Sequence, residues 1–439
     1  MKRYPAYSNY KDSGIPWVGP IPQHWGKARL KALFAFVKGR NASLYTREFI
    51  GENPGGYPVY SGQTADRGVM GKVNRYEYDI PSGIFVTTVG AKAMTPMYIG
   101  GKFCLSQNCL LLVSRGQVYD KYYYYYLLPM FHFERANIPD HMQPSLRISD
   151  LNRYTVLVPP LREQRAIAQF LDKKTEAVDA LIAAKARLDE LWAQYRQAVV
   201  CRGVTQGFAG GGHLKGSPTE WPGEIPAHWQ VKKLAHLLVR NEGGTWGEED
   251  PEGVGTIVLR STEISPDGCW QITDPARCRL ESGEYRRCLL RAGDLLVTKS
   301  SGSARHIGKA ALVDKEVAAM NCAFSNFMQR LRLTSGVHPK YIFYWLNSGP
   351  GRSQLRCLAS ASTGLKNLSG AVIAAMKVPL PPLEEQHAIV RRLDRETARI
   401  DALRAKIQAG LERLEHYRLS AIAEAVTGKT DVRTAGTAL

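Results

Sequence analysis

The chain has 439 residues, which at roughly 150 residues per domain suggests about three domains and ample material for a hydrophobic core. A hydrophobic fraction of 44% and a charged fraction of 22% are typical of folded proteins and exclude wholesale disorder. No apolar run reaches the ~18 residues of a membrane span, and the amino terminus lacks the apolar core of a signal peptide. We therefore expect a cytoplasmic protein without a membrane partner. The eight cysteines contain no C-x-x-C pair, so neither a zinc ribbon nor a disulfide framework is indicated.

The charge is strongly positive, since 58 basic minus 40 acidic residues gives a net charge of +18. Residues 1–155 carry 19 basic and 10 acidic residues (+9), and residues 206–377 carry 21 and 15 (+6). The stretch that follows each of these segments is nearly neutral. A basic surface commonly binds a polyanion, above all nucleic acid.

The chain is built twice. The stretch WVGPIPQHWGKARLKALF, from Trp17 to Phe34, returns as WPGEIPAHWQVKKLAHLL from Trp221, an offset of 204 residues. The stretch VPPLREQRAIAQFLDKKTEAVDAL, from Val158, returns as LPPLEEQHAIVRRLDRETARIDAL from Leu380, an offset of 222 residues. The second copy therefore carries a net insertion of 18 residues between these anchors. Internal repetition of this kind decides how the rest of the chain is interpreted.

Between the anchors the two copies diverge, but the predicted elements keep their order. Each copy has an apolar strand ending in threonine, then a basic turn with an isoleucine–glycine step, then a strand led by asparagine at Asn108 or Asn326. An aromatic helix follows in both. The five consecutive tyrosines of the first copy, residues 122–126, could form a base-stacking platform. A buried helix face is favoured, because the second copy keeps only the apolar character.

Residues 161–201 and 383–425 are predicted to form long helices, each preceded by a Pro-Pro pair. Forty-one residues at 1.5 Å each give a rod of roughly 60 Å. Apolar residues recur at spacings of seven with intermediate threes and fours, which favours a heptad seam. The seam positions are Ile167, Leu171, Val178, Leu181, Leu188, Trp192, Tyr195 and Val199, and then Ile389, Leu393, Ile400, Leu403, Ile407, Leu414 and Tyr417. Two such rods would bury their seams on each other, and an antiparallel pairing would put the globular segments at opposite ends.

The signatures of catalysis that we sought do not occur. The spacing from Gly302 to Gly308 is one residue too long for a Walker A loop, and neither a G-x-G-x-x-G loop nor an amino-methyltransferase N-P-P-[YF] tetrapeptide occurs. The ten histidines show no metal-ligand spacing, so no metal site is expected. A nuclease-like set, Pro139-Asp140 with Asp172-Lys173-Lys174, is disfavoured because Asp172 falls inside a predicted helix. The pattern is typical of a binding protein.

The repeated motifs resemble those of a known family. The motifs PPLREQ (Pro159 to Gln164) and PPLEEQ (Pro381 to Gln386), with W-x-G-x-I-P-x-H-W at Trp17 and Trp221, resemble the specificity subunits (HsdS) of Type I restriction–modification systems. The resemblance covers nearly the whole chain. It implies an α+β fold with two mixed α/β target recognition domains, separated by an antiparallel coiled coil of two long helices in an internal pseudo-twofold repeat.

The resemblance also implies the domain plan and the function. The expected parts are a first recognition domain (1–155), a first spacer helix (156–205), a glycine-rich linker (206–220), a second recognition domain (221–377), a second spacer helix (378–428) and a flexible tail (429–439). Each recognition domain would read one half of a bipartite, asymmetric target in double-stranded DNA. The spacer would dock two modification (methyltransferase) subunits and set the half-site spacing, and restriction (motor-nuclease) subunits would join through them. The chain itself would be non-catalytic and hold no cofactor, with S-adenosylmethionine, ATP and Mg in the partners.

Candidate DNA-contacting residues are polar or basic side chains in glycine-flanked loops or at strand ends, where phosphates and base edges could be reached. In the first copy they are Ser61, Gln63, Thr64, Arg67, Lys72, Arg75, Thr88, Lys92, Lys102, Gln143 and Arg147. In the second copy they are Arg260, Lys299, Ser300, Ser303, Arg305, His306, Lys309, Thr363, Lys366 and Asn367. By contrast, Glu163, Gln164, Glu385 and Gln386 are expected to fix the start of each long helix.

Two other functions stay open from sequence. The chain could be an enzyme with an unrecognised site, in which case the purified protein would cleave DNA with a metal ion. It could instead be a coiled-coil scaffold whose basic ends bind RNA or nothing, in which case binding would be indifferent to duplex sequence.

Overall fold

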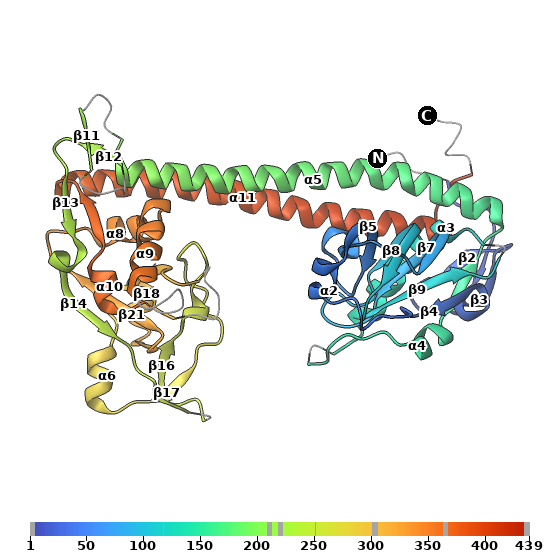
Figure 1. Ribbon diagram of the computed structural model, residues 1–439, viewed down its shortest axis with the longest axis horizontal. Helices are drawn as coiled ribbons and strands as arrows, with labels where there is room; N and C mark the ends of the chain where they lie inside the picture. Colours follow the sequence, from blue (N-terminus) through green and yellow to red (C-terminus); the bar gives the residue numbers. More distant parts are fainter. Residues whose placement is uncertain are drawn as a thin grey trace. The chain divides into compact units, whose positions relative to one another are not determined.

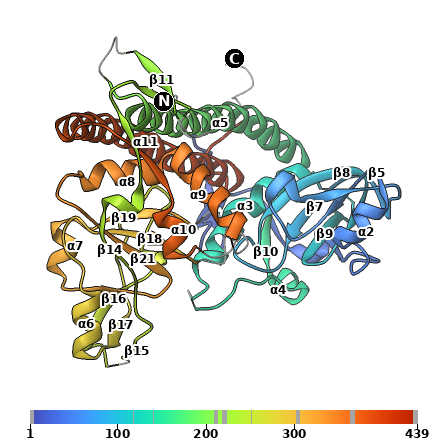
Figure 2. The same ribbon diagram turned by 60° about the vertical axis from the view of Figure 1, so that its left-hand side comes forward.

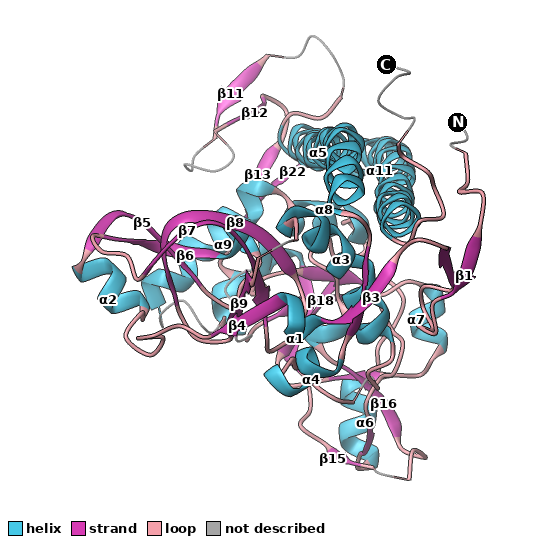
Figure 3. Cartoon of the chain, turned by 90° about the vertical axis from the view of Figure 1, so that its right-hand side faces the viewer, coloured by secondary structure: helices cyan, strands magenta, loops and turns pink. Residues whose placement is uncertain are grey.

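The computed structural model describes residues 5–116, 118–139, 141–208, 213–217, 223–250, 252–300, 306–362 and 368–433. The chain divides into two compact units, which are treated separately below (Figure 1). Unit 1 contains Met1–Ala186 and Gln408–Leu439, and unit 2 contains Arg187–Ile407. Helices and strands are mixed in both units (Figure 3), so the predicted mixed α/β composition is confirmed.

Unit 1 is built around a six-stranded sheet of order β4-β9-β7-β8-β5-β6, in which only β5 and β8 pair in parallel. Two short ladders, β1–β2 and β3–β10, lie outside this sheet. The strands are β1 (Tyr10–Asp12), β2 (Pro20–Pro22), β3 (Gly26–Arg29), β4 (Phe34–Val37), β5 (Pro54–Tyr60), β6 (Val69–Val73), β7 (Tyr78–Thr87), β8 (Pro96–Leu105), β9 (Cys109–Ser114) and β10 (Thr155–Val158). The helices are α1 (Leu30–Leu33), α2 (Arg47–Glu52), the 3-10 turn η1 (Ala65–Gly68), α3 (Asp120–Ala136) and α4 (Ile148–Arg153).

Unit 2 contains two four-stranded sheets, of order β14-β21-β18-β19 and β15-β17-β16-β20. Its strands are β11 (Leu214–Gly216), β12 (Glu224–Pro226), β13 (Gln230–Lys233), β14 (Leu238–Gly243), β15 (Glu248–Glu249), β16 (Thr256–Leu259), β17 (Arg277–Arg279), β18 (Leu295–Thr298), β19 (Ala310–Leu312), β20 (Ala323–Phe324), β21 (Met328–Leu333) and β22 (Lys377–Leu380). The helices are η2 (Leu234–Leu237), η3 (Ser261–Glu263), α6 (Ser282–Cys288), α7 (Lys315–Ala319), α8 (Pro339–Asn347), α9 (Gly349–Ser362) and α10 (Gly370–Ala374). Helices α8 and α10 lie beside the first sheet (Figure 2), and Trp345 and Ile373 share its buried cluster with Leu295 and Leu331.

The internal repeat is visible in the strand order. The run β4-β9-β7-β8 of unit 1 corresponds to β14-β21-β18-β19 of unit 2. The register agrees as well, since Thr87, near the end of one apolar strand, pairs with Cys109, and Thr298, at the end of the other, pairs with Met328. Each unit also has one parallel pair, β5–β8 or β16–β20. The repeat predicted from the sequence is therefore confirmed as a repeat of topology.

Two long helices pass through both units, α5 (Leu161–Thr205) and α11 (Leu383–Val426), and they match the predicted spans within a few residues. In unit 2 the guanidinium of Arg404 binds Asp189 at 2.9 Å, and that of Arg196 binds Asp401 at 2.9 Å. Residue numbers thus rise along α5 as they fall along α11, which confirms the antiparallel pairing. None of the described helices is both long and apolar enough to span a membrane.

Each long helix starts with an equivalent set of side-chain hydrogen bonds, which we call its anchor. The Glu163 carboxylate accepts from Trp25 Nε1 at 2.9 Å and from the Tyr7 hydroxyl at 3.0 Å. Glu385 likewise accepts from Trp229 Nε1 at 3.1 Å. The next residue in each motif also repeats its bonds, because the Gln164 and Gln386 side chains donate to the carbonyls of Pro159 (2.8 Å) and Pro381 (2.9 Å). The expectation that these four residues fix the helix start is confirmed.

The tyrosine run forms a buried helix face, as expected. Tyr122, Tyr123, Tyr125 and Tyr126 of α3 are all buried in the core of unit 1. The Tyr122 hydroxyl donates to the Val426 carbonyl of α11 at 2.9 Å. Tyr125 donates to Asp172 of α5 at 2.8 Å. These bonds tie α3 to the two long helices of unit 1, so the tyrosines are structural.

The predicted heptad seam is only partly correct. Ile167, Leu171, Ile389, Leu393 and Ile400 are buried as expected. In contrast, Leu181, Leu188 and Tyr195 are exposed, with 46%, 43% and 54% of their surface accessible. Half-buried polar residues such as Asp189 and Arg196 meet the facing helix instead and form ion pairs there. Spacing alone could not show which of two neighbouring stripes on α5 faces α11.

Two predicted flexible segments contain ordered structure. Within the predicted linker, Leu214–Gly216 forms β11 and pairs with β12 as β1 pairs with β2 in the first copy; residues 209–212 and 218–222 lie outside the described ranges. Within the predicted tail, Val432 is buried and the Asp431 backbone N–H donates to the Pro5 carbonyl at 2.8 Å. Residues 429–433 therefore belong to unit 1, because their apolar and polar groups find partners there.

Candidate nucleic-acid interface

Backbone hydrogen bonds order three loops of unit 1, one by closing it on itself and two by joining them. The loop after β5 closes on itself, with Ser61 N–H donating to the Gly68 carbonyl at 3.0 Å. The loop after β7 joins the turn before β9, since Thr88 N–H donates to Asn108 O at 2.9 Å. The segment before α4 joins the same loop, since Leu146 N–H donates to Thr88 O at 2.8 Å. These loops carry most of the candidates predicted for the first copy.

The loop after β5 has a strained backbone. Asp66 and Arg67 both adopt left-handed conformations, with φ of 47° and 53°. Such conformations are costly for residues with a Cβ and concentrate at functional sites. The side chain of Gln63 braces the loop by donating to the Val69 carbonyl at 2.7 Å. The Arg67 side chain is exposed on this braced loop, next to the half-buried Thr64.

The remaining candidates of unit 1 divide by exposure. Lys92, Gln143 and Arg147 are exposed on the joined loops, whereas Ser61 and Thr88 are buried and contribute mainly backbone groups. Lys72 is exposed on β6. Two others are occupied within the fold, since the Arg75 guanidinium lies 4.9 Å from the Phe49 ring centre, and Lys102 Nζ lies 4.6 Å from that of Tyr76.

In unit 2, Ser303, Arg305, Thr363, Lys366 and Asn367 lie outside the described residues. Among those described, Lys299, Ser300 and His306 are half-buried around a loop at the end of β18. The Lys299 N–H donates to the Phe327 carbonyl at 2.8 Å, and its own carbonyl accepts from Leu368 N–H at 2.9 Å. Burial lowers the pKa of the Lys299 ammonium group. Lys299 has no ion-pair partner among the described residues.

Two residues predicted to contact DNA in unit 2 have partners within the fold. Lys309 is only 2% exposed, and its ammonium group donates to the Ile264 carbonyl. It therefore holds the fold and presents no cation to solvent, where a phosphate would meet it. Arg260 is bound by Glu249 at 2.7 Å, so its charge is already compensated.

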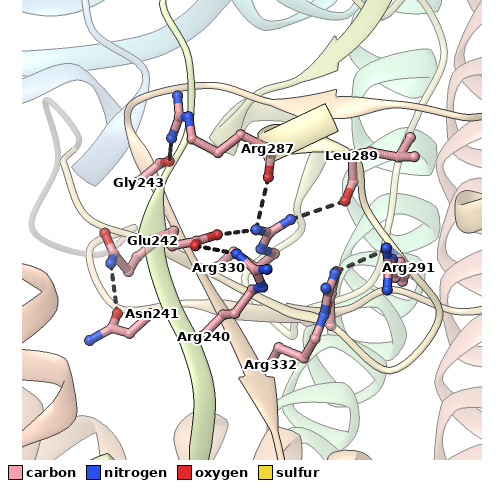
Figure 4. Close-up of polar contacts among 11 residues, drawn as sticks. Arg240, Asn241, Glu242, Gly243, Arg287, Leu289, Arg291, Arg330 and Arg332 are labelled. Carbon is pink, nitrogen blue, oxygen red and sulfur yellow. Dashed lines mark hydrogen bonds and ion pairs between the residues drawn. The ribbon is translucent and has the colours of Figure 1, made fainter. Parts of the chain in front are cut away.

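Arg330 of unit 2 is also internal, and Figure 4 shows its polar contacts. Arg330 is 2% exposed and its guanidinium donates to the carbonyls of Leu289 (3.0 Å) and Arg287 (2.9 Å) and to Glu242. Arg332 binds Asp294 at 2.6 Å. Counting positive residues therefore overstates the charge available to a polyanion.

Sequence reasoning missed a polar group beside Lys299. Gln329 Nε2 donates to Asn241 Oδ1 at 2.6 Å, and Asn241 Nδ2 donates to the Gly370 carbonyl at 2.9 Å. Asn326 lies next to them, and the Arg287 guanidinium donates to the Gly243 carbonyl at 2.9 Å (Figure 4). The asparagine that leads β21 was a visible signal. The others lie on β14, α6 and β21, which only the fold brings together.

Asp172 of the nuclease-like set is bound within the fold. Asp172 accepts from Lys121 at 2.7 Å and from Tyr125 at 2.8 Å, and Asp394 repeats both contacts with Lys340 and Tyr344. Asp140 lies outside the described residues. Over the described part of the chain, no group of three or more His, Cys, Asp or Glu residues is placed to hold a metal ion.

The fold defines a protein made of two related modules, in which one strand order occurs twice. The chain matches the model of the Type I restriction modification DNA specificity domain twice, over residues 22–189 and 226–413. Since these matches cover well over half of the chain, the protein belongs to that family.

Relatives agree with this assignment. The specificity subunit of the Type I restriction enzyme EcoKI from Escherichia coli K12 is 28% identical over 65% of this chain and 60% of its own length. That of StySPI from Salmonella potsdam is 26% identical over 65% of this chain and 59% of its own length. The chain thus matches about 60% of the length of these two relatives. That of MjaVIII from Methanocaldococcus jannaschii is 23% identical over 85% of this chain and 86% of its own length.

One solved structure shares the fold. A chain from a study of complex assembly and conformational transition of the type I R-M system aligns with a TM-score of 0.63 at 14% identity. The alignment covers 92% of this chain and 98% of that one.

Proposed function

We propose that this chain is the DNA sequence-specificity subunit of a Type I restriction–modification complex, without catalysis of its own. Each copy of the repeat reads one half of a bipartite, asymmetric target in double-stranded DNA. The observation that carries the proposal is that one topology occurs twice with different side chains at matching positions. Two related but unequal readers in one chain suit an asymmetric target, as a homodimer suits a palindrome.

The difference between the readers can be stated by register. The position after the shared threonine holds Thr88 in unit 1 and Lys299 in unit 2. The position one residue into the facing strand holds Leu110 in unit 1 and Gln329 in unit 2. At these two positions unit 2 therefore has a cation and a polar amide where unit 1 has a hydroxyl and an apolar residue. Such exchanges change which base edges can be recognised.

The helical spacer is proposed to dock two methyltransferase subunits and to set the half-site spacing. Its support is a groove of about 460 Å³ between α5 and α11 in unit 2. The groove is lined by Leu188, Leu191, Trp192, Tyr195, Ile400 and Leu403, with Glu396 and Arg399 at its side. Exposed apolar surface rimmed by polar residues is typical of protein interaction sites.

Under this proposal the chemistry belongs to the partners. Methyltransferase subunits would bring S-adenosylmethionine, and restriction subunits, joined through them, would bring ATP and Mg. The chain alone is then expected to leave labelled S-adenosylmethionine and duplex DNA unchanged. Methyl transfer by the isolated chain would contradict the proposal.

The deciding experiment is modified-base sequencing of DNA from cells that express the chain with its modification subunits. A split methylated motif with a fixed gap is expected. Residues 26–155 are then replaced by the corresponding segment of a relative, which should change one half of the motif and leave the other intact. If both halves changed together, the two-reader proposal would be wrong.

A further inference from the structure

Two large aromatic side chains stand exposed beside Lys299. Trp246 lies in the loop between β14 and β15, and Phe327 immediately precedes β21; 68% and 44% of their surfaces are accessible. Their ring centres are 5.0 Å apart at an interplanar angle of 81°. This edge-to-face pair is favourable in itself and leaves much of both rings uncovered. Burying those ring surfaces on a ligand would therefore release further free energy.

The backbone that carries Trp246 is held tightly. Thr245 N–H donates to the Phe324 carbonyl at 2.9 Å, and Asn326 N–H donates to the Thr245 carbonyl at 2.8 Å. Thr245 is itself buried, and its hydroxyl donates to Glu284. A Cβ on Gly244 would lie 2.2 Å from the Phe324 carbonyl oxygen, so only glycine allows this approach. The exposed indole is therefore presented from a fixed position, which limits the ordering entropy that binding would cost.

The surroundings of the pair are polar and positive. Lys299 Nζ, Asn326 Oδ1 and Gln329 Oε1 lie 3.2, 3.6 and 3.8 Å from the point that a Cβ on Gly243 would occupy. The Arg287 guanidinium donates to the carbonyl of the same glycine at 2.9 Å (Figure 4). Neither Lys299 nor Arg287 has an ion-pair partner among the described residues.

Of the acidic groups at this place, Glu242 is compensated by cations. Glu242 is bound by Arg240 at 2.8 Å and by Arg330, and Glu284 accepts from Thr245. Glu284 keeps its charge, because a hydroxyl does not compensate it, and Glu248 has no ion-pair partner among the described residues. Lys299 and Arg287, which both lie against Gly243, are the cations that suit a polyanion here. A polyanion with apolar surface to offer the two rings is a nucleic acid.

We propose that Trp246 and Phe327 contact the bases of the half-site read by unit 2, while Lys299 and Arg287 contact the flanking phosphates. The inference rests on the proposed function as a DNA reader. DNA offers apolar surface in two forms, the thymine methyl in the major groove and the face of an unstacked base. The rings of Trp246 and Phe327 would contact either the thymine methyl or the face of the unstacked base. The side chains of Asn326 and Gln329 lie beside the rings and would hydrogen-bond to base edges.

The test uses the full chain in complex with its modification subunits, and duplexes carrying the motif found by modified-base sequencing. Trp246→Ala and Phe327→Ala are compared with Trp246→Phe and with Val254→Ser, which removes another exposed apolar side chain of unit 2. About a ten-fold loss of affinity for the motif duplex is expected for the two alanine variants, because an aromatic contact to a base has this size. Trp246→Phe should keep most of the affinity, and Val254→Ser should match the wild type.

Salt dependence separates the two kinds of contact. Trp246→Ala should leave the slope of log affinity against log salt unchanged, whereas Lys299→Ala should make it shallower by about 0.9. Replacing thymine by deoxyuridine, one position at a time, detects a methyl contact if it weakens the wild type and not Trp246→Ala. A rise in 2-aminopurine fluorescence that needs Trp246 detects an unstacked base.

The outcomes are distinguishable. If the wild-type complex shows no preference for the motif duplex, the proposed function fails, and this inference fails with it. If the wild type is specific and both alanine variants bind the motif duplex equally well, this inference alone is overturned. It is also overturned if the alanine variants impair assembly with the modification subunits and leave DNA affinity intact. Should Trp246→Ala fail to fold, Phe327→Ala and Trp246→Phe decide the matter.

Discussion

The indole Nε1 of Trp25 lies 2.9 Å from the Glu163 carboxylate, and Trp229 and Glu385 repeat the bond at 3.1 Å in the second copy. Both tryptophans are buried, so each bond satisfies a donor that water cannot reach. The two anchors differ in one respect. A histidine also contacts each carboxylate, His24 at Glu163 (2.7 Å) and His228 at Glu385 (2.8 Å). Glu163 accepts in addition from Tyr7, whereas no third partner of Glu385 occurs among the described residues.

Removing the first anchor should therefore cost more than removing the second. Glu163→Ala leaves buried donors unpaired, and we expect it to lower the free energy of unfolding by about 3 kcal/mol. Glu385→Ala should cost less, since this carboxylate serves fewer donors and is more exposed, at 22% against 10%. Urea unfolding followed by tryptophan fluorescence measures both, with the exposed Glu176→Ala as control. Equal losses would contradict the interpretation.

Acid should weaken unit 2 through His338. Burial lowers the pKa of His338, and His387, whose ring centre is 4.6 Å away, acts in the same direction with Lys340, while Asp394 opposes them. The unfolded chain regains a pKa near 6.5, so below that pH it binds a proton that the folded state does not. Stability is therefore unaffected above this value and decreases as the pH falls below it.

The matched variant for this pH effect is His338→Asn. In the wild type, Nδ1 of His338 accepts from the Lys340 N–H at 3.2 Å at the start of α8. Asparagine also caps helices but does not titrate. Melting temperatures between about pH 7 and pH 5 should fall less for the variant than for the wild type. Parallel curves would show that other groups dominate.

The buried Arg330 should be costly to remove. Its loss strands the carbonyls of Arg287 and Leu289 and leaves Glu242 with Arg240 alone. Breaking a buried ion pair typically costs about 3–5 kcal/mol. Arg330→Leu should lower the unfolding free energy by this amount, and adding Glu242→Gln should recover part of it. Lys232→Ala, an exposed basic residue of β13, should leave thermal unfolding unchanged; a similar loss there would point to a general charge effect.

Exchanging the two charges of an ion pair between the long helices should preserve stability. Arg404 and Asp189 form a two-pronged contact at 2.9 and 3.1 Å. Such pairs are partly solvated, so Asp189→Arg should cost on the order of 1 kcal/mol through like-charge repulsion. The reciprocal change Arg404→Asp should restore most of it. A double variant no more stable than the single one would mean that the two residues do not interact in solution.

The parts of the fold that could be predicted are those determined by local sequence patterns or by the internal repeat. Pro-Pro before Leu161 and Leu383 marked where both long helices begin, and the repeat fixed the twofold plan. The glutamate and glutamine anchors were predictable because both copies keep them. Which residues of α5 are exposed was harder to predict. Leu188 and Ile182 lie on neighbouring stripes of the helix, and only packing decides that Ile182 is half-buried and Leu188 is exposed.

The candidate interface was less predictable. Lys299 was expected at a strand end and lies there, but Lys309, ten residues later, is buried on the Ile264 carbonyl. Polar residue type could not distinguish the two, because either a phosphate or a carbonyl satisfies an ammonium group. Trp246 carried no signal at all, since its exposure depends on Gly244 and Phe324, which pairing of distant segments brings together.

Unit 1 is assembled from two segments that unit 2 separates in the sequence, and this sets the order in which the units can fold during translation. Tyr122 bonds the Val426 carbonyl, Tyr10 bonds the Gly428 carbonyl, and Asp431 bonds Pro5. Residues 1–186 of unit 1 must therefore wait until residues 408–439 are translated, whereas residues 187–407 of unit 2 emerge as one uninterrupted stretch. The module made second is the one that can finish folding first. A nascent chain that stops short of residue 408 exposes the apolar faces of α3 and α5, which makes it a substrate for chaperones and proteases.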